Sequence, residues 1–114
     1  MKKQILFSMI AILMISMTVI AHAPKKIILT FDKATSTLTA DMIHKVKDVN
    51  AHYISDVTIY VNGEEVKVAT FEKQAEILNE VSDFKLEGIK AGDEIKLVAK
   101  CNKFGKKSAK IVVE

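Results

Sequence analysis

Residues 56–71 read DVTIYVNGEEVKVATF, and no other stretch of the chain signals its local structure as clearly. Apolar and polar side chains alternate on both sides of the dipeptide Asn62-Gly63. Asparagine and glycine supply the positive φ angles that a tight type I′ turn needs, and such a turn joins two antiparallel strands. The stretch therefore predicts a β-hairpin over residues 56–71.

Strand-like runs also lie on both sides of this hairpin. They are rich in β-branched or alternating apolar residues and cover 26–31, 35–42, 83–88, 95–101 and 108–113. Residues 44–51 are polar and aperiodic, as loops are, and residues 74–81 are too short to decide between two helical turns and an irregular edge segment. About seven short strands at regular spacing predict an all-β fold, an immunoglobulin-like β-sandwich in one domain.

The N-terminus carries a different pattern. Met1-Lys2-Lys3 precedes an uncharged apolar run over residues 5–21, and this combination is typical of a secretory signal peptide. Cleavage after Ala21 leaves a mature domain of residues 22–114, whereas cleavage after Ala23 also removes His22. An uncleaved run is nearly long enough to anchor the chain in a membrane. We expect an exported domain, periplasmic or secreted, with membrane contact only if the run is retained.

Charge balance and missing residue types exclude several classes of function. Residues 22–114 hold 15 lysines and 14 acids, since two of the chain's 17 basic residues, Lys2 and Lys3, precede them. The chain has no arginine, the residue that most often binds phosphates and base edges. It also has no glycine-rich phosphate loop, no G-x-S-x-G nucleophile elbow and no C-x-x-C pair. We therefore expect no nucleic-acid partner.

Cys101 is the chain's only cysteine, so it cannot form a disulfide within the domain. It could serve as a buried apolar side chain, as a thiol that pairs with another molecule, or as a metal ligand. Loops at one end of a sandwich cluster in space, so His44 and His52, which bracket one loop, can converge on Cys101. Imidazole and thiolate together suit iron, copper or zinc and do not suit calcium or magnesium.

Several short motifs occur in an order that is known from one family. His52-Tyr53-Ile54 leads into a strand, Gly92-Asp93 forms a turn before another strand, and the segment 101–105 has the form C-N-x-x-G. This pattern resembles the desulfoferrodoxin and neelaredoxin superoxide reductases, and it identifies the chain as a divergent relative. The resemblance covers 44–107 and extends to His22, whose H-x-P context the family shares.

The resemblance implies an immunoglobulin-like sandwich that holds one mononuclear ferrous iron. His44 and His52 would be equatorial ligands, Cys101 the axial thiolate, and His22 a third histidine ligand. The thiolate would donate electron density to the iron, and one open position would admit superoxide. An electron-donor protein would be the second partner.

Three departures from the family pattern bear on activity. Phe104 stands where the family has its last histidine, Lys45 replaces a proline, and Ile20-Ala21 stand where a Glu-Lys pair attracts and protonates the substrate. These changes reduce the ligand set and remove the charged pair, so both an enzyme and a binding module are considered.

Three hypotheses therefore stay open. The first is an exported superoxide reductase-like domain that binds iron. The second is a non-enzymatic module that binds iron or copper, with zinc as a further metal, in which a mature N-terminal His22 would add an amine to its imidazole. The third is an immunoglobulin-like interaction domain with a degenerate site that a buried Phe104 fills.

Overall fold

The computed structural model describes residues 22–114, so the predicted signal peptide or anchor over residues 1–21 lies outside the described part. Seven strands follow one another along the chain: β1 (Lys26–Asp32), β2 (Thr37–Ile43), β3 (Ile54–Val61), β4 (Glu64–Thr70), β5 (Asn79–Lys85), β6 (Glu94–Cys101) and β7 (Lys106–Val112). Within the same residues, no helix is long and apolar enough to cross a membrane.

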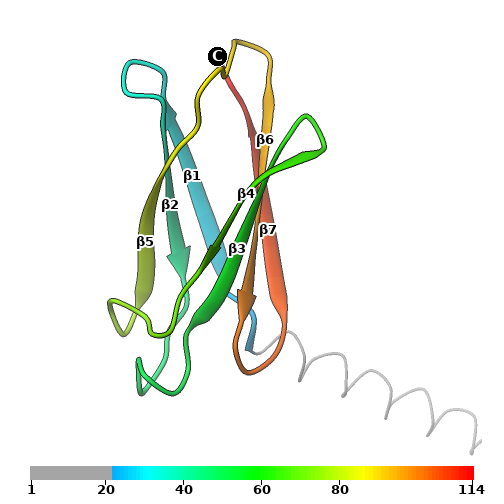
Figure 1. The fold of residues 1–114 in the computed structure, drawn as a ribbon. Helices are drawn as coiled ribbons and strands as arrows, with labels where there is room; N and C mark the ends of the chain where they lie inside the picture. The colour runs from blue at the N-terminus through cyan, green and yellow to red at the C-terminus, as the bar shows by residue number, and fades with distance from the viewer. Residues whose placement is uncertain (1–21) are drawn as a thin grey trace, which may run out of the picture.

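The strands form two antiparallel sheets that face each other (Figure 1). One sheet has the order β1-β2-β5 and the other the order β4-β3-β6-β7. The predicted all-β sandwich with seven strands is confirmed. The hairpin that predicted it is also confirmed, since Val61 pairs with Glu64 across Asn62 and Gly63, whose φ angles are 51° and 84°.

Alternation along the strands builds the core between the sheets. In β2 the inward side chains are Leu38, Ala40 and Met42, and in β6 they include Ile95 and Leu97, all fully buried. Residues of one strand that are two apart share a face, so these rows point at each other across the sandwich. Burial of such apolar rows is the main source of stability in a domain of this size.

The segment that sequence periodicity could not assign makes no helical turn. Residues 71–78 run irregularly from one sheet to the other, and β5 begins at Asn79, four residues before the predicted start at 83. The first residues of β5 do not show the apolar-inward, polar-outward alternation of a strand, because here a polar residue faces inward and an apolar residue faces outward. Glu80 faces inward and is only 6% exposed, whereas Val81 faces outward and is 51% exposed.

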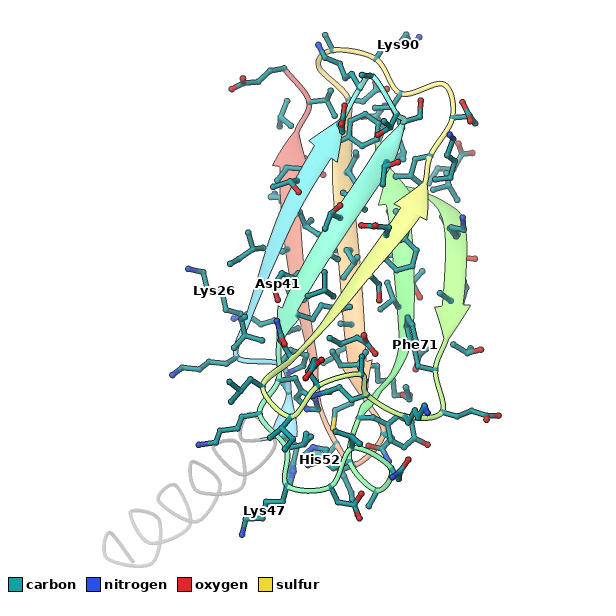
Figure 2. All side chains as sticks on the ribbon, turned by 90° about the vertical axis from the view of Figure 1, so that its left-hand side faces the viewer. Lys26, Asp41, Lys47, His52, Phe71 and Lys90 are labelled. Atoms are coloured by element: carbon teal, nitrogen blue, oxygen red, sulfur yellow. The ribbon has the colours of Figure 1, made fainter. Side chains whose placement is uncertain are left out.

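The two ends of the sandwich are built from different loops (Figure 1). Loops over residues 44–53, 71–78 and 102–105 lie at one end, which we call the His52 end. Turns over residues 33–36, 62–63 and 86–93 lie at the other, which we call the Asn62 end. Figure 2 shows His52 and Lys47 together at one end and Lys90 at the opposite end.

Candidate metal centre

Two inward-facing rows and one loop each bring a residue that could bind a metal to the His52 end. His44 follows the buried row of β2, two residues after Met42, and Cys101 is the last inward residue of β6. His52 lies two residues before the buried Ile54 that opens β3. Alternation along β2 and β6 directs His44 and Cys101 toward the space between the sheets. His52 reaches the same space from the loop that precedes β3.

The structure brings these three side chains together, as the sequence predicted. One ligand atom from each of His44, His52 and Cys101 lies within 4.8 Å of the other two. The Nε2 atom of His52 is 3.1 Å from Sγ of Cys101, and the rings of His44 and His52 are nearly perpendicular, with centroids 4.8 Å apart. Atoms that bind one metal at about 2.0–2.3 Å lie ~3.5 Å apart, so small side-chain movements would suffice.

The donor set fits a thiophilic transition metal. Two imidazoles and a thiolate suit iron, copper or zinc, and all three residues are wholly or partly shielded from solvent. Cys101 is 2% exposed, and its sulfur also accepts a 3.4 Å hydrogen bond from the backbone N–H of Lys103. This contact and the 3.1 Å approach of His52 fix the sulfur in place at the edge of the core.

His22 lies beside this cluster and is not one of its three members. Its ring centroid is 5.7 Å from that of His52. Its backbone carbonyl oxygen, rather than its imidazole, contacts Nε2 of His44 at 3.1 Å. The predicted neighbourhood of His22 is therefore present, while the role of its imidazole as a ligand stays a prediction.

The environment of His52 favours its neutral form. Burial lowers the pKa of its imidazole below the usual value of 6.5, and the nearby charges of His44, His22 and Lys103 lower it further. A neutral imidazole has a free lone pair on one nitrogen, which is what a metal requires. The shift therefore prepares His52 as a ligand near neutral pH.

Asn102 joins the loop that carries His52 to the strand end that carries Cys101. Its Oδ1 atom accepts the N–H of Tyr53 at 2.8 Å, and its Nδ2 atom donates to the carbonyl of Ala51 at 3.0 Å. The backbone N–H of Asn102 donates to the carbonyl of Tyr53 at 2.9 Å. Both chain neighbours of His52 are thus held by the residue that follows Cys101.

Gln74 is a site residue that sequence reasoning did not find. Its side chain is 1% exposed and contacts Nδ1 of His44 at 2.8 Å. The residue lies in the irregular segment 71–78, where no periodicity marks an inward position. A glutamine among charged and apolar residues has no spacing that would relate it to His44, 30 residues earlier.

Phe104 does not fill the site. It is 53% exposed in the turn over residues 102–105, which closes with a 3.0 Å hydrogen bond from the N–H of Cys101 to the carbonyl of Gly105. The expectation that a buried Phe104 occupies the ligand shell is wrong, because this short turn holds the residue on the surface. Phe104 in place of a histidine therefore means one potential ligand fewer, but its side chain does not occupy the space between His44, His52 and Cys101.

The segments around the cluster are rich in positive charge. Over residues 44–53, 71–78 and 101–107 the charged residues are Lys45, Lys47, Lys73, Lys103, Lys106 and Lys107 against Asp48, Glu72 and Glu76. Lysines on neighbouring loops raise the local concentration of small anions. The His52 end therefore suits an anionic ligand or substrate.

Comparison with known proteins gives a match in structure alone. No protein-family model matches the chain, and no curated protein matches it in sequence. The fold resembles that of a superoxide reductase with one iron from Giardia intestinalis, with a TM-score of 0.58 and 14% identity over 81% of this chain and 97% of that one.

Two other solved structures are similar. A variant of the superoxide reductase neelaredoxin from Ignicoccus hospitalis has a TM-score of 0.51 and 21% identity over 88% of this chain and 86% of that one. A hypothetical protein from Pyrococcus horikoshii has a TM-score of 0.57 and 13% identity over 80% of this chain and 89% of that one. The resemblance seen in the sequence motifs thus has a counterpart in three dimensions, and the chain has the fold of the superoxide reductases.

Proposed function

We propose that the chain is a divergent superoxide reductase-like domain that binds a mononuclear iron through His44, His52 and Cys101. The observation that carries this proposal is their convergence, within 4.8 Å, at one end of a sandwich with the superoxide reductase fold. The motifs around His52 and Cys101 support it independently, because they resemble those of the family. His22 is a further candidate ligand through its position beside His52.

Each residue has a defined part in this proposal. Ferrous iron, when bound, supplies the electron that reduces superoxide. His44 and His52 would offer imidazole nitrogens to the metal, and Cys101 would offer a shielded sulfur that keeps electron density high at the site. Lys103 lies close enough to His52 to depress its pKa, and its ammonium group would attract an anion such as superoxide.

The proposal is tested by loading the purified protein with ferrous iron without oxygen and then oxidising it. We expect a visible thiolate-to-iron absorption band that Cys101→Ser abolishes, and faster consumption of superoxide than metal-free protein gives. Lys103→Gln should slow this consumption without removing the band, since the lysine steers the anion and binds no metal. A wild-type protein that shows no band after loading and oxidation would contradict the proposal.

A second candidate function is a non-enzymatic metal-binding module, with copper as its metal. Two imidazoles and one thiolate are the ligand set of copper electron-transfer sites, which favours this reading. His22 beside His52 adds a further observation, because a mature N-terminus at His22 would place an amine near the cluster. This candidate requires export and cleavage after Ala21, which we propose from the sequence of residues 1–21.

One experiment separates the two candidates. Cell fractionation and the intact mass of the mature protein report where it is found and where it begins. A chain that begins at His22 and retains copper against excess ferrous iron supports the module. A chain that begins at Pro24, or that retains the apolar run, has no His22 amine and contradicts the amine-based copper site.

A further inference from the structure

We propose that Gln74 is a positioning residue that fixes the tautomer of His44, so that its Nε2 atom carries a free lone pair for the metal. The metal half of this inference rests on the proposed function, whereas the tautomer itself is a property of the metal-free chain. Gln74 lies outside the motifs that resemble the family. The contacts of its side chain carry the argument.

The orientation of the Gln74 amide follows from its partners. Its Nε2 atom lies 2.7 Å from the carbonyl oxygen of His44 and 2.8 Å from that of Glu76. Carbonyl oxygens only accept hydrogen bonds, so the amide nitrogen, with its two protons, must occupy this position. The amide oxygen is thereby directed at the imidazole of His44.

This orientation decides which ring nitrogen of His44 is protonated. Oε1 of Gln74 is 2.8 Å from Nδ1 of His44, and an amide oxygen only accepts. Nδ1 therefore carries the proton and donates it. A neutral imidazole has one N–H, so Nε2 is left with a lone pair, as metal-binding histidines require.

A competing acceptor lies on the other side of the ring. The carbonyl oxygen of His22 is 3.1 Å from Nε2 of His44, so that contact would favour a proton on Nε2 instead. The hydrogen bond to Gln74 is the shorter of the two, and it lies in the more buried position. Without Gln74 the proton would move to Nε2, and Nε2 would lose the lone pair that a metal needs.

Burial makes this arrangement rigid. The Gln74 side chain is 1% exposed, and its backbone N–H also donates to the carbonyl of Val49 at 2.9 Å. The same stretch is held by hydrogen bonds from the N–H of His44 to Leu78 and from the N–H of Val46 to Ile77. The segment that crosses between the sheets is thus fastened to the loop that begins at His44, with Gln74 as its one inward side chain among residues 72–78.

The first test reads the tautomer directly in metal-free protein. Nitrogen-15 chemical shifts of the His44 ring, recorded at a pH where the ring is neutral, distinguish a proton on Nδ1 from one on Nε2. We expect Nδ1–H in the wild type. A wild-type protein with the proton on Nε2 overturns the inference, whether or not any variant folds.

The second test uses two variants of similar size. Gln74→Met removes the acceptor, while Gln74→Glu keeps an oxygen opposite Nδ1, and both lose the amide donors to His44 and Glu76. Gln74→Met should shift the proton to Nε2 and weaken ferrous iron binding about 10- to 100-fold, and Gln74→Glu should keep the proton on Nδ1 and lose much less affinity. Because both lose the same two donors, similar melting temperatures would show that the difference in affinity does not come from stability.

The outcomes separate this inference from the proposed function. An unchanged tautomer in Gln74→Met, or equal iron affinity in that variant and the wild type, overturns the positioning role and leaves the metal site standing. Conversely, a wild type with Nδ1–H that binds no ferrous iron contradicts the proposed function and leaves the tautomer assignment standing.

Discussion

At both ends of the sandwich an exposed asparagine joins two loops by hydrogen bonds, yet the side chains gathered between the loops differ. At the Asn62 end, Nδ2 of Asn62 donates to Asp93 at 3.0 Å and Oδ1 accepts the N–H of Glu94 at 2.9 Å. At the His52 end, Asn102 makes the equivalent pair of contacts with Tyr53 and Ala51. The two asparagines thus form a matched pair.

The two ends differ in the other polar groups that lie near each asparagine. At the Asn62 end Asp93 also accepts the N–H of Lys90, so its carboxylate is satisfied within the turn. At the His52 end the amides hold the loops while two ring nitrogens and a sulfur face one another. Gathering two imidazoles and a thiol in a shielded place costs stability. At the Asn62 end the side chains satisfy one another within the turns, whereas the His52 end gathers three residues that could hold a metal.

The largest expected effect comes from removing a ligand at the His52 end. His52→Gln keeps a polar side chain of similar length but replaces the imidazole, so we expect affinity for ferrous iron to fall more than about 100-fold. His52 is partly exposed, and the fold should survive. Equilibrium dialysis measures the affinity, and unchanged binding would remove His52 from the site.

The matched asparagines give the next largest effect. Asn102→Ala and Asn62→Ala should each lower the free energy of unfolding by about 1–2 kcal/mol, because each loses two hydrogen bonds at the surface. Asn62 has a positive φ of 51°, which adds a cost for alanine at that position. Thermal denaturation measures both.

Only one of the two should also affect the metal. Asn102→Ala frees the backbone on both sides of His52, so iron affinity should fall about tenfold, whereas Asn62→Ala should leave it unchanged. Equal losses of affinity would mean that the two ends are not functionally distinct.

The two ends should also respond to pH in opposite directions. Burial raises the pKa of Glu80, at the His52 end of β5, above its ordinary value of 4.5, even though the Ala75 N–H opposes the shift. The folded protein then binds the Glu80 proton more tightly than the unfolded chain does. The stability that this proton contributes is therefore full below pH 4.5 and is lost as the pH rises through the folded pKa. Glu80→Gln should therefore stabilise the protein at pH 7 and change little below pH ~4.

Asp93 behaves in the reverse sense. Hydrogen bonds from the Lys90 N–H and the Asn62 amide lower its pKa, so its contribution is present above the ordinary value and is lost as pH falls. Asp93→Asn should destabilise the protein at pH 7 and less so in acid. Urea denaturation at several pH values measures both variants, and matching pH profiles would contradict this difference.

Phe104→His gives the smallest effect. The side chain is exposed, so the free energy of unfolding should change by less than about 0.5 kcal/mol. Because the turn over residues 102–105 keeps position 104 at the surface, we expect iron affinity to rise less than about tenfold. A much larger gain, with no binding in the wild type, would identify the present site as degenerate.

The sequence predicted most of the fold because apolar alternation coincides with the inward rows of six strands. It failed at the start of β5, where a buried Glu80 and an exposed Val81 invert that pattern. The positions of His44, His52 and Cys101 were predictable because loops at one end of a sandwich cluster in space and because the motifs around His52 and Cys101 resemble those of one family. Gln74 and Phe104 were not, since the burial of a loop side chain depends on how the backbone crosses between the sheets, which no periodicity encodes.

The most direct test of the account is the iron content of the protein after anaerobic loading and removal of free metal. We predict about one iron per chain in the wild type and in Asn62→Ala, and none in Cys101→Ser, whose melting temperature reports that the fold is retained. Iron retained equally by Cys101→Ser, or absent from the wild type, would contradict the claim that His44, His52 and Cys101 form a metal site.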